Sequence, residues 1–393
     1  MLAARRRVNN KSHRVVFVVM RRSGSATLWL AEGFVPHFRE MVELGREVVR
    51  ALSNEHGPDV VVERFADPFW LTSFACILGF EWDTSGQTTV TLRAVKHGLA
   101  GTDIPVRVLG GKGSEMRMAQ LEAAKTLSEI GVRDVGEVRR VIKLTCTVDD
   151  AAVQDSHEIY FHSTVVSETG KWAVVNQGMN TRARTARRYH WSSDRGVGVE
   201  EPHASIVSDR VEEVVLDMTS RKSAETRKTI LEMLSDTPPS RLNEDLSRAK
   251  ALMKKQTLLD GDVKFVVEKM PETLLPPKRF DEEALRRTKN VRGFEELLTI
   301  GGIGPAAVRG LAYVACLVYG SSVSWHDPAK YAYAFGTKSG RPYYVDRRAM
   351  VEAAAVLRDA VMKARIGDGE KVAALRRLSA FMQEFGERGP VNH

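Results

Sequence analysis

Apolar residues recur at steps of three and four positions through most of the chain, a period typical of helices with one buried face. This pattern predicts helices over residues 38–55, 60–65, 115–130, 135–144, 219–234 and 242–259. Gly57-Pro58 separates the first two, and Asp67-Pro68 begins an apolar stretch over residues 69–80. By their period, residues 88–99 fit either a strand or a helix.

The period changes to two between residues 160 and 177, which indicates half-buried strands. Two strands are predicted, over residues 160–167 and 171–177, with a turn at Glu168-Thr169-Gly170 between them. Alternation places Tyr160, His162 and Thr164 on one face of the first strand. This mixture predicts an α/β or α+β domain whose sheet contains a β-hairpin.

The composition changes near residue 219, where charged helical patterns replace the mixed pattern. Prolines 271, 276 and 277 mark a second break, which is typical of a linker. We therefore predict an N-terminal extension over 1–19, an α/β domain over 20–215, a helical linker region over 216–280 and an all-α domain over 281–393. Within the last domain, residues 331–344 are punctuated by glycine and proline and are predicted to form a loop.

Two short apolar-periodic segments between Phe294 and Tyr319 flank a Gly-Gly-Ile-Gly turn. Gly302 and Gly304 can adopt positive φ, Ile303 is apolar, and Pro305 suits the first turn of the second helix. The stretch resembles the helix-hairpin-helix motif, and this resemblance implies binding to a nucleic-acid backbone without reading its sequence. The alternative is an ordinary pair of helices packed into a core.

One position departs from that motif. Ala306 lies where the members that cleave DNA through a Schiff base carry lysine. The resemblance therefore implies a backbone-binding turn formed by Gly302, Ile303 and Gly304 and assisted by Arg309, without the chemistry of that lyase.

Composition and charge favour a polyanionic partner and argue against a membrane protein. The net charge is +8, the isoelectric point is near 9.3, and no apolar run approaches the length of a membrane span. Residues 15–20 are too short an apolar run for the core of a signal peptide. Three isolated cysteines suit a reducing compartment, so we expect a cytoplasmic, nucleoid-associated protein. A homodimer is compatible with the sequence.

A Gly-Lys segment over residues 109–114 precedes a predicted helix. Its glycine spacing differs from that of an ATP-binding P-loop, so we expect a plain loop or a turn in which Lys112 contacts phosphate.

The segment from residue 148 to 162 holds four carboxylates and two imidazoles, namely Asp149, Asp150, Asp155, Glu158, His157 and His162. Oxygen ligands with occasional imidazole suit Mg²⁺ or Mn²⁺, and a bound cation of this kind supports phosphodiester hydrolysis. We predict metal ligation by Asp149, Asp155, Glu158 and His162, with Gln177 as a supporting residue. The alternative is that these acids cap helices and lie on a solvated surface.

Arginines 182, 184, 187 and 188 precede Tyr189 and Trp191. Arginine with aromatic rings suits single-stranded nucleic acid, whose phosphates pair with guanidinium groups while its bases stack. We predict that Arg187 and Arg188 bind DNA; an arginine-rich surface beside a buried tryptophan is the alternative.

Several blocks together resemble the domain-of-unknown-function 763 family of archaea and some bacteria: RRSGSATL at 21–28, DPFW at 67–70, GGKG at 110–113, AAVQDSHEIYFH at 151–162, WAVVNQGMN at 172–180, ARRYHW at 186–191, EEPH at 200–203 and YGSSVSWHDPAKYAYAFG at 319–336. The resemblance covers about residues 20–385. It implies an N-terminal α/β domain and a C-terminal helix-hairpin-helix domain in a nucleic-acid-related protein. Among its polar positions, it favours Gln154, Asp155, His162, Gln177 and Asp149 as catalytic residues.

The resulting prediction is a DNA-binding protein that cuts single-stranded or unpaired regions with Mg²⁺ or Mn²⁺. One alternative is a DNA-binding or repair adaptor without enzymatic activity. A base-excision glycosylase ranks last, because Asp346 lies farther from the hairpin than the catalytic aspartate of those enzymes and Ala306 replaces their lysine.

Overall fold

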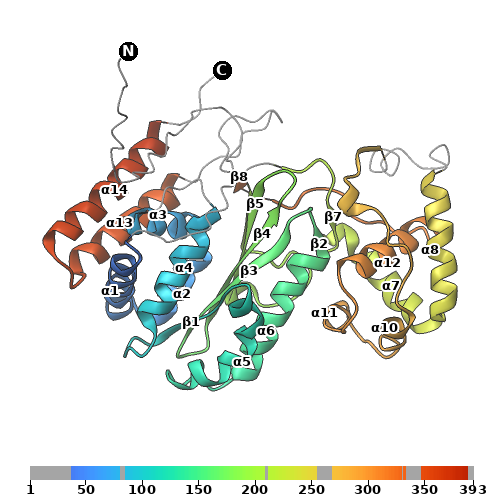
Figure 1. Cartoon of the computed structure of the whole chain (residues 1–393), viewed down its shortest axis with the longest axis horizontal. Coiled ribbons are helices and arrows are strands. Elements are labelled where there is room, and N and C mark those ends of the chain that lie inside the picture. The colour runs from blue at the N-terminus through green and yellow to red at the C-terminus, as the bar shows by residue number, and fades with distance from the viewer. Residues whose placement is uncertain are drawn as a thin grey trace, which may run out of the picture.

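The computed structural model describes residues 37–79, 85–208, 211–254, 268–329, 331–332 and 347–387. A central sheet lies between an N-terminal group of helices and a second group that follows it in the chain (Figure 1). The predictions for residues 1–19, for most of the 331–344 loop and for Asp346 lie outside these described residues.

Four helices form the N-terminal group: α1 (Phe38–His56), α2 (Pro58–Ala66), α3 (Pro68–Leu78) and α4 (Ser85–Leu99). The Asp67 carboxylate caps α3 by accepting hydrogen bonds from the amides of Phe69 and Trp70, and every residue of α3 is buried. Residues 88–99, whose period fits either a strand or a helix, are helical and belong to α4. In this helix Gln87, Thr91 and Val95 are buried at four-residue steps.

The main sheet has the order β1-β3-β4-β5-β6-β8, and its strands are antiparallel except for the parallel pair β6 and β8. The strands are β1 (Val106–Lys112), β3 (Glu158–Ser167), β4 (Trp172–Asn180), β5 (Thr185–Ser192), β6 (Ser205–Ser208) and β8 (Tyr331–Ala332). The predicted β-hairpin is therefore confirmed.

The Gly-Lys segment is part of strand β1, so the prediction of a loop there is wrong. Gly110 has a φ of +87°, and a Cβ atom at this position would lie 2.4 Å from the carbonyl oxygen of His162 on β3. Glycine is therefore required at residue 110, because β1 and β3 approach each other closely there. The glycine pattern in the sequence does not distinguish such a close approach from a loop.

Helices cover both faces of the sheet. Phe161 and Val165 of β3 pack against α1–α4, whereas Val166 and Val174 pack on the opposite side, with α5 (Ser114–Ser128) and α6 (Val135–Thr147). Asp134 caps α6, its carboxylate accepting a hydrogen bond from the Glu137 amide at 2.8 Å.

The second helical group contains α7 (Ala224–Asp236), α8 (Pro239–Lys254), α10 (Glu282–Arg286), α11 (Phe294–Leu298) and α12 (Pro305–Leu317). Its apolar side chains join those of α5 and α6 in one continuous core. A small sheet of β2 (Val153–Gln154) and β7 (Leu216–Asp217) lies between the main sheet and the second helical group (Figure 1). The chain also contains a short π-helix, η1 (Val148–Ala152), and short 3-10 helices η2 (Ser193–Arg195), η3 (Arg221–Ser223) and η5 (Glu272–Leu274).

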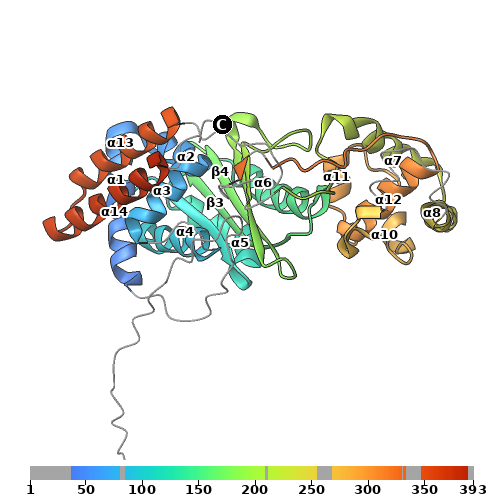
Figure 2. The same cartoon turned by 90° about the horizontal axis from the view of Figure 1, so that it is seen from above.

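The last two helices, α13 (Arg347–Lys363) and α14 (Asp368–Glu387), lie beside α1 and α3 at the far end of the molecule (Figure 2). Ala353, Leu357 and Leu378 belong to the core of α1–α4. The prediction of one helical unit over 281–393 is therefore wrong, because an amphipathic period shows that a helix has a buried face but not which partner covers it. Among the described residues, no helix is both long and apolar enough to cross a membrane.

Candidate functional site

Two aspartates of the segment 149–155, Asp149 and Asp155, lie alongside β5. Alternate residues of β5, namely Arg187, Tyr189 and Trp191, each donate a hydrogen bond to one of two aspartates in this segment. Side chains at steps of two share one face of a strand, so β5 presents its three donors in a row.

Asp149 is fully buried and accepts several hydrogen bonds. The indole Nε1–H of Trp191 lies 3.0 Å from Oδ2, the Asn176 amide nitrogen lies 2.7 Å from Oδ2, and His203 Nε2 lies 2.6 Å from Oδ1. Since a carboxylate only accepts, His203 donates through Nε2. Both oxygens of Asp149 are therefore occupied by protein donors.

His162 continues this network on β3. Its Nδ1 lies 2.6 Å from Oδ1 of Asn176 and 3.2 Å from Cys146 Sγ, and the Thr164 hydroxyl lies 2.7 Å from Nε2. Burial lowers the pKa of His162 to about 4. The imidazole is therefore neutral near pH 7, with both of its nitrogens in hydrogen bonds.

Asp155 forms a second buried centre. It accepts from the backbone amide of His157 at 3.0 Å, from Arg187 Nη1 at 2.9 Å and from the Tyr189 hydroxyl at 2.7 Å. Burial opposes ionisation, but Arg187 and His157 outweigh it and hold the pKa of this carboxyl well below its usual range. Arg187 also pairs with Asp327, so this guanidinium lies between two carboxylates.

These contacts test whether the predicted metal ligands fit a cation. The oxygens of Asp149 and Asp155 and the nitrogens of His162 already bind protein groups, and Glu158 is exposed at the start of β3. Within the part of the chain that the structure describes, no three His, Cys, Asp or Glu side chains form a group that could hold a metal ion. The four predicted ligands therefore do not form one open site.

Gln177 lies on the opposite face of the sheet from Asp149 and His162. Its amide nitrogen is 3.0 Å from the Ser85 carbonyl oxygen and 2.5 Å from the Tyr160 hydroxyl, on the side covered by α4. The prediction that Tyr160 shares a face with His162 is wrong, because a bulge between Ile159 and Phe161 turns Tyr160 to the other side.

Only part of the predicted arginine-aromatic surface is exposed, namely Arg182 and Arg184. Arg187, Tyr189 and Trp191 have no exposed area, and Arg188 is 6% exposed and donates to the Thr72 hydroxyl. The prediction that Arg187 and Arg188 contact DNA is therefore wrong. Lys112 remains exposed at the end of β1, with its ammonium 5.6 Å from the centre of the Tyr160 ring.

The predicted glycine turn does connect two helices, α11 and α12. Gly302 has a φ of +91°, Ile303 is 4% exposed and packs into the core, and Gly301, Gly302 and Ala306 are exposed. Gly304 has a φ of −106°, so positive φ is required only at Gly302. No side chain caps α12, which leaves the amides of its first turn without intrahelical partners.

Gln154 and Arg309 contact each other inside the molecule. The amide nitrogen of Gln154 donates to the carbonyl oxygens of Ala151 at 2.9 Å and Pro305 at 2.8 Å, and its Oε1 accepts from Arg309 at 2.6 Å. Arg309 also donates to the Leu275 carbonyl. These two residues link the 149–155 segment to the first turn of α12.

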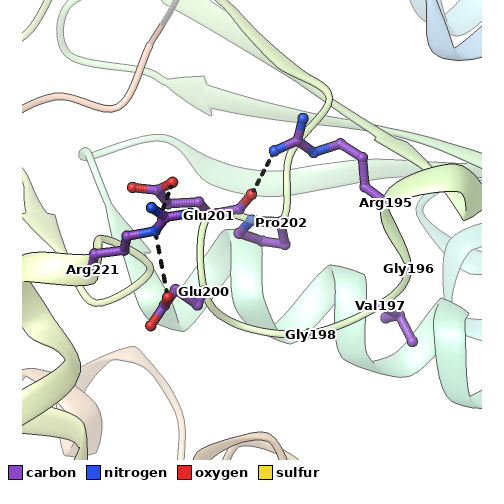
Figure 3. A pocket seen from close by; sticks show the side chains of 8 residues that line it. All are labelled: Arg195, Gly196, Val197, Gly198, Glu200, Glu201, Pro202 and Arg221. Atoms are coloured by element: carbon purple, nitrogen blue, oxygen red, sulfur yellow. Dashed lines mark hydrogen bonds and ion pairs between the residues drawn. The ribbon is translucent and has the colours of Figure 1, made fainter.

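A polar pocket of about 300 Å³ lies beside Pro202 (Figure 3). Its lining includes Glu200, Glu201, Arg195 and Arg221, and Arg221 pairs with both glutamates at 3.6 and 3.4 Å. The charges in this pocket are therefore already balanced within the protein.

Sequence reasoning did not assign His203, Asn176, Trp191 and Asp327 to the buried centres. All four lie in the blocks that resemble the family, but nothing local indicates which partner each one contacts.

Residues 24–345 match a family model described as "Protein of unknown function (DUF763)", which agrees with the resemblance of the sequence blocks. No curated protein and no solved structure matches the chain.

Proposed function

The chain belongs to the DUF763 family, and from its geometry we propose that it binds the backbone of single-stranded or unpaired DNA through the turn between α11 and α12. In this proposal, the two helices act as a helix-hairpin-helix motif. The observation that carries it is the exposed Gly301-Gly302 turn directly before the uncapped first turn of α12.

The chemistry of a helix N-terminus supports this assignment. Amides in the first turn lack intrahelical acceptors, and the helix dipole favours negative charge there. A DNA phosphate supplies both the acceptor oxygens and the charge. The buried Ile303 holds the turn against the core while its glycine neighbours leave room for a backbone to approach.

Ala306 provides the test, because it is exposed at the start of α12. Ala306→Glu puts a carboxylate beside the proposed phosphate position, yet an acidic residue in the first turn suits the helix dipole. Fluorescence anisotropy with labelled single-stranded, bubble and duplex DNA is expected to show much weaker binding for this variant. Ala355→Glu on α13 is the matched control, and equal binding by both variants would contradict the proposal.

Metal-dependent phosphodiester cleavage is a second candidate, favoured by Asp150 and Glu158. Burial raises the pKa of Asp150, and a hydrogen bond from the Ile159 backbone lowers it in part. The carboxylates of Glu158, Asp149 and Asp155 raise the pKa further. A divalent cation beside these two carboxylates would offset their repulsion. We derive no catalytic step from it, because the predicted ligand set does not form an open site.

A cleavage assay with Mn²⁺ or EDTA tests this second candidate. Asp150→Asn and Glu158→Gln are expected to abolish metal-dependent cutting, and Glu168→Gln, an exposed residue of the β3–β4 turn, is expected to retain it. DNA binding without cutting on every substrate would instead support the non-enzymatic adaptor.

A further inference from the structure

We propose that the DNA-contacting surface extends from the glycine turn onto α6, where Lys143 contacts a phosphate. This inference rests on the proposed function and names a residue that the hairpin sequence does not contain. Part of the DNA contact then comes from α6, one of the helices that cover the sheet. DNA would therefore bind to α6 as well as to the second helical group.

Two cations from different elements meet at the turn. Lys143 Nζ of α6 lies 2.9 Å from the Thr299 carbonyl oxygen, and Arg287 Nη2, which follows α10, lies 2.8 Å from the Gly301 carbonyl oxygen. Both residues are exposed. An ammonium has three donors and a guanidinium has five, so these bonds leave further donors at the surface beside the turn.

The surroundings extend the positive charge. Arg139 and Arg140 precede Lys143 by four and three positions, which places all three on the exposed side of α6. Lys289 and Arg292, in the loop between α10 and α11, are exposed and form no ion pair within the described part of the chain.

Carboxylates lie among these cations and limit the net charge. Arg140 pairs with Glu137 and lies near Glu295, and Arg287 pairs with Glu283. Like Lys289 and Arg292, Lys143 forms no ion pair among the described residues, and its hydrogen bond to the Thr299 carbonyl holds its ammonium beside the turn. For this reason we assign the phosphate contact to Lys143.

A purely structural role is the competing explanation, because the carbonyl groups at the end of α11 attract cations. Lys143→Gln separates the two roles, since its amide retains a donor for the Thr299 carbonyl but loses the charge. Lys143→Arg keeps both. Lys371→Gln is the matched control, because Lys371 on α14 also donates to a backbone carbonyl, that of Met362, at 2.9 Å.

The experiment measures DNA affinity of the full chain against salt concentration, together with thermal unfolding. A lost phosphate contact is expected to weaken binding roughly fivefold at low salt and to reduce the slope of log K against log salt by about 1. We expect these changes for Lys143→Gln, with a melting temperature close to wild type, and wild-type binding for Lys143→Arg and Lys371→Gln.

The outcomes separate this inference from the proposed function. Wild-type binding with an unchanged slope in Lys143→Gln overturns the inference alone. An equal loss in Lys371→Gln also overturns it, because the effect would then be one of overall charge. A wild-type chain that binds no DNA overturns the proposed function as well.

Discussion

Arg309 donates a hydrogen bond of 2.6 Å to the side-chain oxygen of Gln154, and thereby joins α12 to β2 across 155 positions of the chain. The same glutamine donates to the Pro305 carbonyl at the start of α12. The first turn of the hairpin's second helix is therefore held against the segment that contains Asp149 and Asp155. DNA bound at the glycine turn would lie at a defined position relative to the sheet.

Gln154→Ala tests this link. The change removes the acceptor of Arg309 Nη1 and the side-chain donor to the Pro305 carbonyl, so we expect the free energy of unfolding to fall by about 1–3 kcal/mol in urea denaturation. Gln383→Ala, at an exposed position of α14, is expected to have no comparable effect. Equal stabilities for the two variants would show that the link contributes nothing.

Asp155→Asn should be among the most destabilising changes. Removing one carboxylate leaves Arg187 buried with only Asp327 to balance it, and breaking a buried ion pair costs about 3–5 kcal/mol. Urea denaturation measures the loss. A variant that unfolds at the wild-type midpoint would contradict the assignment of Asp155 as a structural acceptor, and would reopen its role as a metal ligand.

Asp155 also makes the free energy of unfolding depend on pH in the acidic range. Its folded pKa lies below that of an unfolded aspartate, about 3.9, so the stabilisation is present above that pH and is lost as pH falls toward the folded pKa. Denaturation curves between pH 5 and pH 2, on the order of one per half unit, should show a shallower decline for Asp155→Asn than for wild type. Parallel declines would count against this account.

His162 affects the free energy of unfolding over a higher pH range than Asp155 does. Its folded pKa is about 4, below the ordinary value of 6.5, so protonation favours the unfolded chain. Stability from this group is full above pH 6.5, falls between pH 6.5 and about 4, and changes by about 3 kcal/mol in total. His162→Gln should flatten this part of the profile, and an unchanged slope would mean that the imidazole is accessible to protons in the folded state.

Gly302 and Gly304 should respond differently to alanine. A Cβ at Gly302 would lie 2.7 Å from Ala284 Cβ at a φ of +91°, so we expect a loss of about 1–3 kcal/mol together with weaker DNA binding. A Cβ at Gly304 would have no heavy atom within 4 Å, so its stability should change by less than about 0.5 kcal/mol. Thermal unfolding of the two variants compares them, and equal losses would refute the geometric argument.

Local patterns were sufficient for much of the secondary structure. Helices α1, α2, α5 and α6, the β3–β4 hairpin and the turn between α11 and α12 all lie close to their predicted positions. These features depend on residues a few positions apart, whose spacing the sequence displays directly. The same reasoning failed at Gly110 and Tyr160, where pairing with a neighbouring strand determines the conformation. At Gly110 the two strands approach closely, and at Tyr160 a bulge interrupts their pairing.

The chemistry of the polar segment depended on contacts that no local pattern contains. The sequence showed that Asp149, Asp155 and His162 lie close together along the chain, and from this we predicted a metal site. The tertiary structure instead supplies donors from Asn176, Arg187 and His203, and it brings Asp327 to Arg187 across 140 positions. A carboxylate serves as a ligand or as a structural acceptor according to which donors surround it, and only the folded arrangement of β4, β5 and the later loops determines those donors.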